Sequence, residues 1–257
     1  MQAFFDVKQR TARAVRLLFL TTLISAAPAV IYAQEDSQNE PEQITEPDLA
    51  LADVPRQNLS GMEWLERLAQ INRTSNFEVS FVLTRAGQEM TPYLWRHAVL
   101  EDGLEAEQLN LQNGPGQEMI RLGNVVSVFE PDVQPYSIYA SAISGPLPSD
   151  LLYNPTALSD AYQFITIGRT RVSGRAAQQL RIVSRDNKRY NYQVWLDEET
   201  GMLLKLDMVD LQGSLLEQIQ VTAVNVSEQP SPYFSRINPQ ALPGAVAMTP
   251  KPRQHQW

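Results

Sequence analysis

The spacing of hydrophobic residues along the chain changes once, near position 76. Before that point Leu65, Leu68 and Ala69 recur every three or four residues, which places them on one face of a helix. Ser60 and Glu63 have the spacing of a capping box, in which each side chain accepts a hydrogen bond from a free backbone N–H. The pattern predicts one amphipathic helix that begins at Ser60 and packs on a sheet.

From Asn76 onward apolar and polar residues alternate, as they do in strands with one buried face. After a first strand that starts there, further strand-like runs occur at 91–100, 106–112, 117–122, 125–130, 162–173, 178–185, 189–196, 202–210 and 215–226. Short turns rich in Gly, Asn and Asp separate most of these runs, and short connections join neighbouring antiparallel strands. We expect a mainly β (α+β) fold: a curved antiparallel sheet or unclosed β-barrel of about ten strands with packed helices.

The stretch 140–162 interrupts the alternation. It is apolar but holds three prolines and a glycine, so it cannot form a regular central strand. Long ordered loops in a compact domain are often lids or binding loops, whereas a packed surface loop with a short helix near 149–153 is the other interpretation. The residues of the candidate lid are Leu147, Leu151, Leu152 and Tyr153.

The first 33 residues have the composition of a secretory signal peptide. Four basic residues precede an apolar run from Leu17 to Ala29, and small residues follow as far as Ala33. The run is shorter than the roughly 20 apolar residues that span a membrane, so we favour cleavage after Ala33 over an uncleaved anchor. The sequence therefore predicts an exported mature protein.

Charge and proline content divide the rest of the chain. The sequence has 21 basic and 29 acidic residues, a formal charge of −8, which argues against nucleic acid as a partner. Residues 34–57 hold seven of the acids and are predicted to be a disordered acidic spacer. Residues 58–227 form the predicted folded domain, and the proline-rich residues 228–257 are interpreted as a linker or tail.

The sequence offers little catalytic chemistry. It has no cysteine, which excludes thiol nucleophiles, disulfides and Cys-ligated zinc. His97 is the one histidine of the predicted domain, and without a nucleophile-elbow motif we interpret it as structural; a hydrolase that uses it is the enzyme alternative. The acids at 197–199 precede Gly201 and indicate a charged hairpin turn. We expect no enzyme, catalytic residue, metal site or cofactor.

One helix covers a sheet of about ten strands poorly, so apolar strand residues can line a cavity, although ordinary core packing fits the same pattern. The candidate cavity residues are Phe77, Val79, Phe81, Leu204, Leu206, Met208, Ile219 and Val221. Basic residues also cluster between 169 and 189, and the planar donor fork of arginine suits anionic groups. The candidate contacts to an anionic headgroup are Arg169, Arg171 and Arg181, with pairing to acids on a sheet surface as the alternative.

Four segments resemble, in order and spacing, the large N-terminal domain of the RseB/MucB family. They are Val128–Ile138 (VFEPDVQPYSI), Tyr162–Val172 (YQFITIGRTRV), Arg181–Asp197 (RIVSRDNKRYNYQVWLD) and Leu204–Val226. The resemblance extends from about Met62 to Val226. It implies a LolA-like fold, an unclosed antiparallel barrel with helices in its mouth.

The family resemblance also implies a function. RseB and MucB are non-enzymatic periplasmic regulators of the sigma-E envelope stress response that bind the periplasmic domain of an anti-sigma factor (RseA or MucA) and protect it from proteolysis. Lipopolysaccharide or a related lipid is thought to release that partner. The implied partners are an anti-sigma factor and a lipid. The protein would contact the membrane only through the anti-sigma factor. The alternative function is a LolA-like carrier of lipids or lipoproteins. The small C-terminal domain of the family is not expected within the 257 residues.

Overall fold

The computed structural model describes residues 58–246, so the predicted signal peptide (1–33) and acidic spacer (34–57) lie outside the described residues. The helices are α1 (Gly61–Thr74), α2 (Ser149–Tyr153) and the short 3-10 helices η1 (Pro155–Leu158), η2 (Phe234–Arg236) and η3 (Pro239–Ala241). The strands are β1 (Asn76–Arg85), β2 (Thr91–Val99), β3 (Glu105–Leu111), β4 (Glu118–Leu122), β5 (Val125–Phe129), β6 (Tyr136–Tyr139), β7 (Tyr162–Val172), β8 (Arg175–Ser184), β9 (Asn191–Asp197), β10 (Leu203–Val209), β11 (Leu215–Ser227) and β12 (Ala245–Val246). None of the helices within 58–246 is long and apolar enough to cross a membrane.

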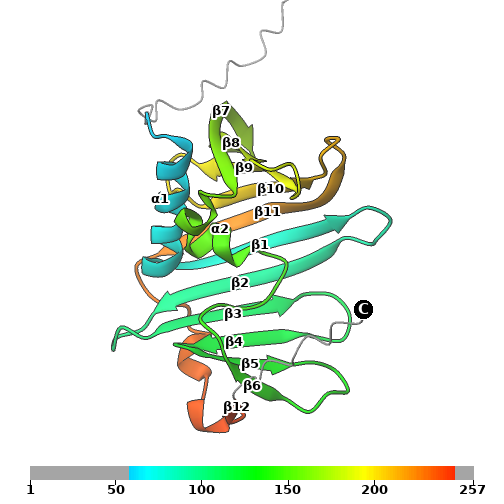
Figure 1. Cartoon of the computed structure of the whole chain (residues 1–257). Coiled ribbons are helices and arrows are strands. Elements are labelled where there is room, and N and C mark those ends of the chain that lie inside the picture. Colours follow the sequence, from blue (N-terminus) through cyan, green and yellow to red (C-terminus); the bar gives the residue numbers. More distant parts are fainter. Residues whose placement is uncertain (1–57, 247–257) are drawn as a thin grey trace, which may run out of the picture. The chain divides into compact units, whose positions relative to one another are not determined.

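Two antiparallel meanders, β1–β6 and β7–β11, meet at a seam in the middle of one curved sheet (Figure 1). At this seam β11 returns to pair with β1, from Asn76 opposite Ser227 to Arg85 opposite Glu217. The strand order is β12-β6-β5-β4-β3-β2-β1-β11-β10-β9-β8-β7, so β12 and β7 are the two ends of an unclosed sheet in the described residues. This order confirms the predicted mainly β, unclosed antiparallel architecture with packed helices.

Helix α1 lies on the concave face of the sheet and fills much of it. Its capping box is confirmed, with Ser60 N 2.7 Å from Glu63 Oε2 and Glu63 N 3.3 Å from Ser60 Oγ. Trp64, Leu65 and Leu68 of α1 are at most 1% exposed and join one apolar core with residues from both meanders. The burial of this helical stripe, rather than intrinsic helix propensity, stabilises α1 on the sheet.

The stretch predicted as a linker or tail is ordered and packed as far as Val246. We call residues 228–246 the C-terminal strap. Phe234 of the strap is 5% exposed and packs against Ala98 and Ala106, whose side chains leave the sheet on the face opposite α1. At the end of the strap, β12 pairs in parallel with β6 and forms that end of the sheet. The folded unit therefore extends beyond residue 227.

The tip of the β9–β10 hairpin is attached to α1. Arg67 of α1 donates a hydrogen bond to Glu199 O at 2.7 Å, and Ile71 packs beside Gly201. The predicted charged turn lies here, but Asp197 and Glu198 are almost fully buried, 1% and 5% exposed. Arg175 Nη2 lies 2.6 Å from Asp197 Oδ2, and Arg169 forms an ion pair with Glu198. These acids are internal ion-pair partners rather than solvated turn residues.

Substitution of Gly201 by alanine should destabilise the fold more than the same change at Gly213. Gly201 has φ +81°, and an added Cβ would lie 2.8 Å from Ile71 Cδ1. The left-handed backbone costs an L-residue about 1–2 kcal/mol, and crowding against α1 adds about 1–3 kcal/mol. Gly213, at φ +88° with nothing within 4 Å of the added Cβ, carries the backbone cost alone. Equal losses of unfolding free energy in urea titrations of both variants would contradict this packing.

Phe234→Ala should lower the free energy of unfolding by about 3–5 kcal/mol, the usual cost of deleting a buried aromatic ring. Val246→Ala, at a side chain that is 60% exposed in the same strap, should change it by less than about 0.5 kcal/mol. Urea denaturation followed by circular dichroism measures both. An unchanged Phe234→Ala protein would mean that the strap does not contribute to the folded unit.

Candidate binding cavity

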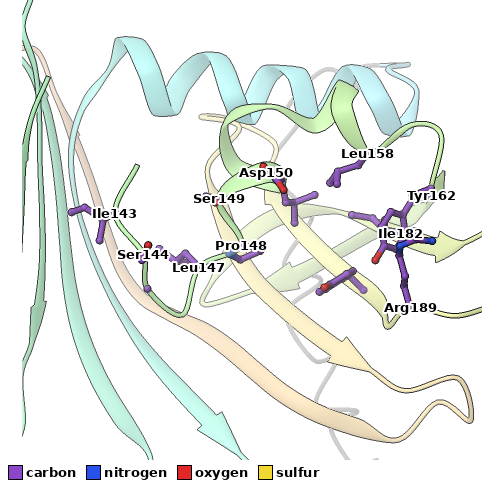
Figure 2. A pocket seen from close by; sticks show the side chains of 14 residues that line it. Ile143, Ser144, Leu147, Pro148, Ser149, Asp150, Leu158, Tyr162, Ile182 and Arg189 are labelled. Carbon is purple, nitrogen blue, oxygen red and sulfur yellow. The ribbon is translucent and has the colours of Figure 1, made fainter. Parts of the chain in front are cut away.

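A cavity of about 790 Å³ lies between residues 140–161, which we call the roof, and the ends of β7, β8 and β9 (Figure 2). The roof contributes apolar side chains, including Ile143, Leu147 and Leu151, and the strands contribute Tyr162 and Ile182. Arg189 and Tyr192 also line the cavity. Ser144, Ser149 and Asp150 add polar groups to the lining, and the volume lies within the roughly 300–1,000 Å³ of small-molecule sites.

The roof combines both interpretations made from its sequence. It contains the short helix expected near 149–153, as α2, and it lies over a cavity as a lid would. Of the candidate lid residues, Leu147 and Leu151 line the cavity, whereas Leu152 and Tyr153 line a small adjoining hollow beside Trp95 and Glu107. Whether the roof moves stays a prediction.

A buried polar cluster on β2, β3 and β4 holds the end of α2 against the sheet. Glu107 Oε1 accepts hydrogen bonds from Trp95 Nε1 and from the Tyr153 hydroxyl, both at 2.7 Å. Glu107 Oε2 lies 2.8 Å from Arg121 Nε, and the two charged side chains are 4% and 3% exposed. Burial, and to a smaller extent the adjacent Glu107 carboxylate, raises the pKa of Tyr153 well above its ordinary value. The phenol therefore stays protonated and donates.

Helix α1 holds the same end of the roof from the other side. Asn72 Nδ2 donates to Leu152 O at 3.1 Å, and Arg73 Nη1 donates to Tyr153 O. Earlier in the roof, Gly145 lies so close to the sheet that an added Cβ would be 2.6 Å from Leu109 Cδ2. The roof thus lies close to the sheet at Gly145, and the end of α2 is hydrogen-bonded to both α1 and the sheet.

The predicted cavity residues do not line this cavity. Phe77, Val79, Phe81, Leu206, Ile219 and Val221 are at most 2% exposed and belong to the core under α1. Met208 is half-buried on β10. Leu204 packs on the opposite face with Trp195, because a bulge between Leu203 and Lys205 shifts the alternation by one residue. The core-packing alternative therefore describes most of this set.

The three candidate headgroup arginines are also away from the cavity. Arg169 is engaged by Glu198, and Arg171 is exposed on β7. Arg181 is exposed on β8 and lines a separate hollow of about 310 Å³. The basic cluster does supply one cavity residue, Arg189, which also forms an ion pair with Asp186. Contact of Arg169, Arg171 or Arg181 with an anionic headgroup stays a prediction.

His97 is a core residue. It is fully buried, its Nδ1 lies 2.7 Å from Ser75 O, and its ring stacks on Phe77 with centroids 5.3 Å apart. Burial lowers the pKa of His97, so the neutral ring is favoured. Among residues 58–246 no group of three or more His, Asp or Glu side chains is arranged to hold a metal ion.

The cavity between the roof and the unclosed sheet has the size and the concave position of a small-molecule site. The family model described as MucB/RseB N-terminal domain matches residues 60–246. The chain therefore belongs to the MucB/RseB family, which confirms the family predicted from the sequence.

Curated relatives agree with this assignment. The sigma-E factor regulatory protein RseB of Escherichia coli (strain K12) is 34% identical over 185 residues, 72% of this chain and 57% of RseB. The sigma factor AlgU regulatory protein MucB of Pseudomonas aeruginosa is 32% identical over 178 residues, 66% of this chain and 52% of MucB. The chain thus spans little more than half the length of these relatives.

A solved structure of the Pseudomonas aeruginosa MucA/MucB complex matches with a TM-score of 0.55 and 28% sequence identity. The match covers 69% of this chain and 61% of that chain.

Protonation of His97 should make the fold less stable in mild acid. The pKa of this histidine is about 6.5 when unfolded and lower when folded, so between the two values the unfolded chain binds more protons. The free energy of unfolding should therefore fall as pH decreases below about 6.5. In urea titrations between pH 7.5 and roughly 5, the free energy of unfolding should depend less on pH for His97→Gln than for the unsubstituted protein. The same pH dependence in both proteins would contradict this role of His97.

Proposed function

We propose that this chain is a periplasmic regulator of a sigma-E-type envelope stress response. In this role it binds the periplasmic segment of an anti-sigma factor similar to RseA or MucA and protects that segment from proteolysis. Family membership supports the proposal most directly, because the relatives are named sigma factor regulatory proteins and MucB has been solved with MucA. The predicted signal peptide, cleaved after Ala33, supports a periplasmic location.

We further propose that a lipid, such as lipopolysaccharide, binds the roofed cavity and releases the anti-sigma factor. Apolar side chains line much of a cavity of about 790 Å³ and suit an acyl chain, and Arg189, which lines the cavity together with polar residues such as Ser149 and Asp150, suits an anionic group at the end of that chain. Each buried CH2 contributes about 0.8 kcal/mol. Binding is reciprocal: a lipid that prefers the free regulator weakens the regulator–partner complex by the same factor.

The test is a titration of the mature chain, residues 34–257, with the purified periplasmic segment of the anti-sigma factor, with and without lipopolysaccharide. We expect saturable binding that lipid weakens at least fivefold, the lower end of usual coupling between sites. Lipid binding without partner binding would favour the alternative, a lipid or lipoprotein carrier. Extraction of lipoproteins from membranes by the purified protein would then identify the carrier.

A matched pair of variants tests whether the cavity carries the lipid effect. Leu158→Trp narrows the cavity, because Leu158 lines it. Ala157→Trp adds the same ring to the same 3-10 turn, but at an exposed position. Lipid should lose its effect on partner binding in Leu158→Trp and keep it in Ala157→Trp. An unchanged lipid effect in Leu158→Trp would place the lipid elsewhere.

A further inference from the structure

The hydrogen bond between the Tyr153 hydroxyl and Glu107 lies in the small hollow that adjoins the cavity. Tyr153 ends α2, the helix whose first residues line the cavity, and its hydroxyl donates to a carboxylate that belongs to the sheet. We propose that this hydrogen bond is a latch: a ligand that extends from the cavity toward the sheet binds by releasing the Tyr153 side chain from Glu107 and opening the small hollow beside them. The proposal deepens the proposed lipid-binding function and rests on it.

The cavity leads directly to the latch. A hollow of only about 10 Å³, too small for more than about one water molecule, is lined by Trp95, Glu107 and Tyr153. It shares Gly145 and Leu147 of the roof with the main cavity. A ligand that extends from the cavity along the sheet therefore reaches the Tyr153 hydroxyl next.

The roof lies close to a side chain of the sheet where the cavity and the small hollow meet. Gly145 approaches Leu109 so closely that even one added methyl group would lie 2.6 Å from Leu109 Cδ2. Interiors this close-packed do not stretch continuously but change between discrete arrangements. An acyl chain that passes this point must displace the side chains of Leu109 and Tyr153, which line the small hollow.

The open state leaves no buried charge without a partner. When Tyr153 departs, Trp95 and Arg121 still hydrogen-bond Glu107, and the freed hydroxyl can bind water. Release therefore breaks one hydrogen bond rather than isolating a carboxylate, which would be far more costly. The bonds from Asn72 and Arg73 hold the backbone at the end of α2 on α1, so release moves the Tyr153 side chain.

Tyr153→Phe tests the latch, with Tyr139→Phe as a matched control at an exposed tyrosine of β6. Each full-length mature protein is titrated with dimyristoyl phosphatidylglycerol, which has two acyl chains, and with myristoyl lysophosphatidylglycerol, which has one. A hydrogen bond to a charged group is worth enough to expect about tenfold tighter binding of the two-chain lipid by Tyr153→Phe. The one-chain lipid should bind both variants and the unsubstituted protein alike.

Hydrogen exchange of the roof supplies a second readout that does not depend on a variant. In the unsubstituted protein the two-chain lipid should speed amide exchange at 150–154, whereas the one-chain lipid should not. The latch is overturned if Tyr153→Phe binds the two-chain lipid no more tightly than Tyr139→Phe, or if that lipid leaves roof exchange unchanged or slower. If neither lipid binds any of these proteins, the latch fails together with the lipid part of the proposed function. Partner binding, measured separately, remains a test of the regulator part.

Discussion

The pairing of β1 with β11 is the interaction on which the rest of the fold depends. Most other strand pairs in the sheet join neighbours in sequence, but this seam joins residues about 140 apart in the chain. Closing so long a loop costs entropy that only burial on both sides of the seam offsets. The core under α1 supplies that burial, because Phe81 on β1 and Ile219 on β11 belong to the same apolar cluster. Without the seam, two separate meanders would each expose half of a core.

The seam also determines where a cavity can form. Helix α1 covers the strands nearest the seam, so the large apolar residues there are packed as core. Farther along the second meander the concave face is covered by the roof, a segment whose prolines and glycine prevent it from packing as a regular element. An irregular cover leaves space that a helix would fill, and the cavity lies there.

Local signals explain what the sequence could predict. The capping box and the alternation of Phe77, Val79 and Phe81 depend on neighbours in the chain, and both were confirmed. The strands β6 and β12 were missed because they are four and two residues long, and β12 exists only through its contact with β6. Alternation identifies residues that leave one face of a sheet, but not what covers them. Nor does it reveal a bulge, so Leu204 was assigned to the wrong face.

The two ends of the sheet are protected from unwanted strand pairing by different means. The unpaired backbone groups of an edge strand can hydrogen-bond to strands of other chains, and proteins prevent this with charges, bulges or a covering segment. The β7 edge carries Arg169 and Arg171 and a bulge between Thr166 and Gly168. At the other end of the sheet, β6 carries Tyr136 and Tyr139 instead, and its outer side is paired with β12 of the C-terminal strap. The strap therefore protects β6 from pairing with other chains and also contributes to the core. A fragment that ends after β11 would leave the outer side of β6, with its two tyrosines, unpaired and prone to aggregate.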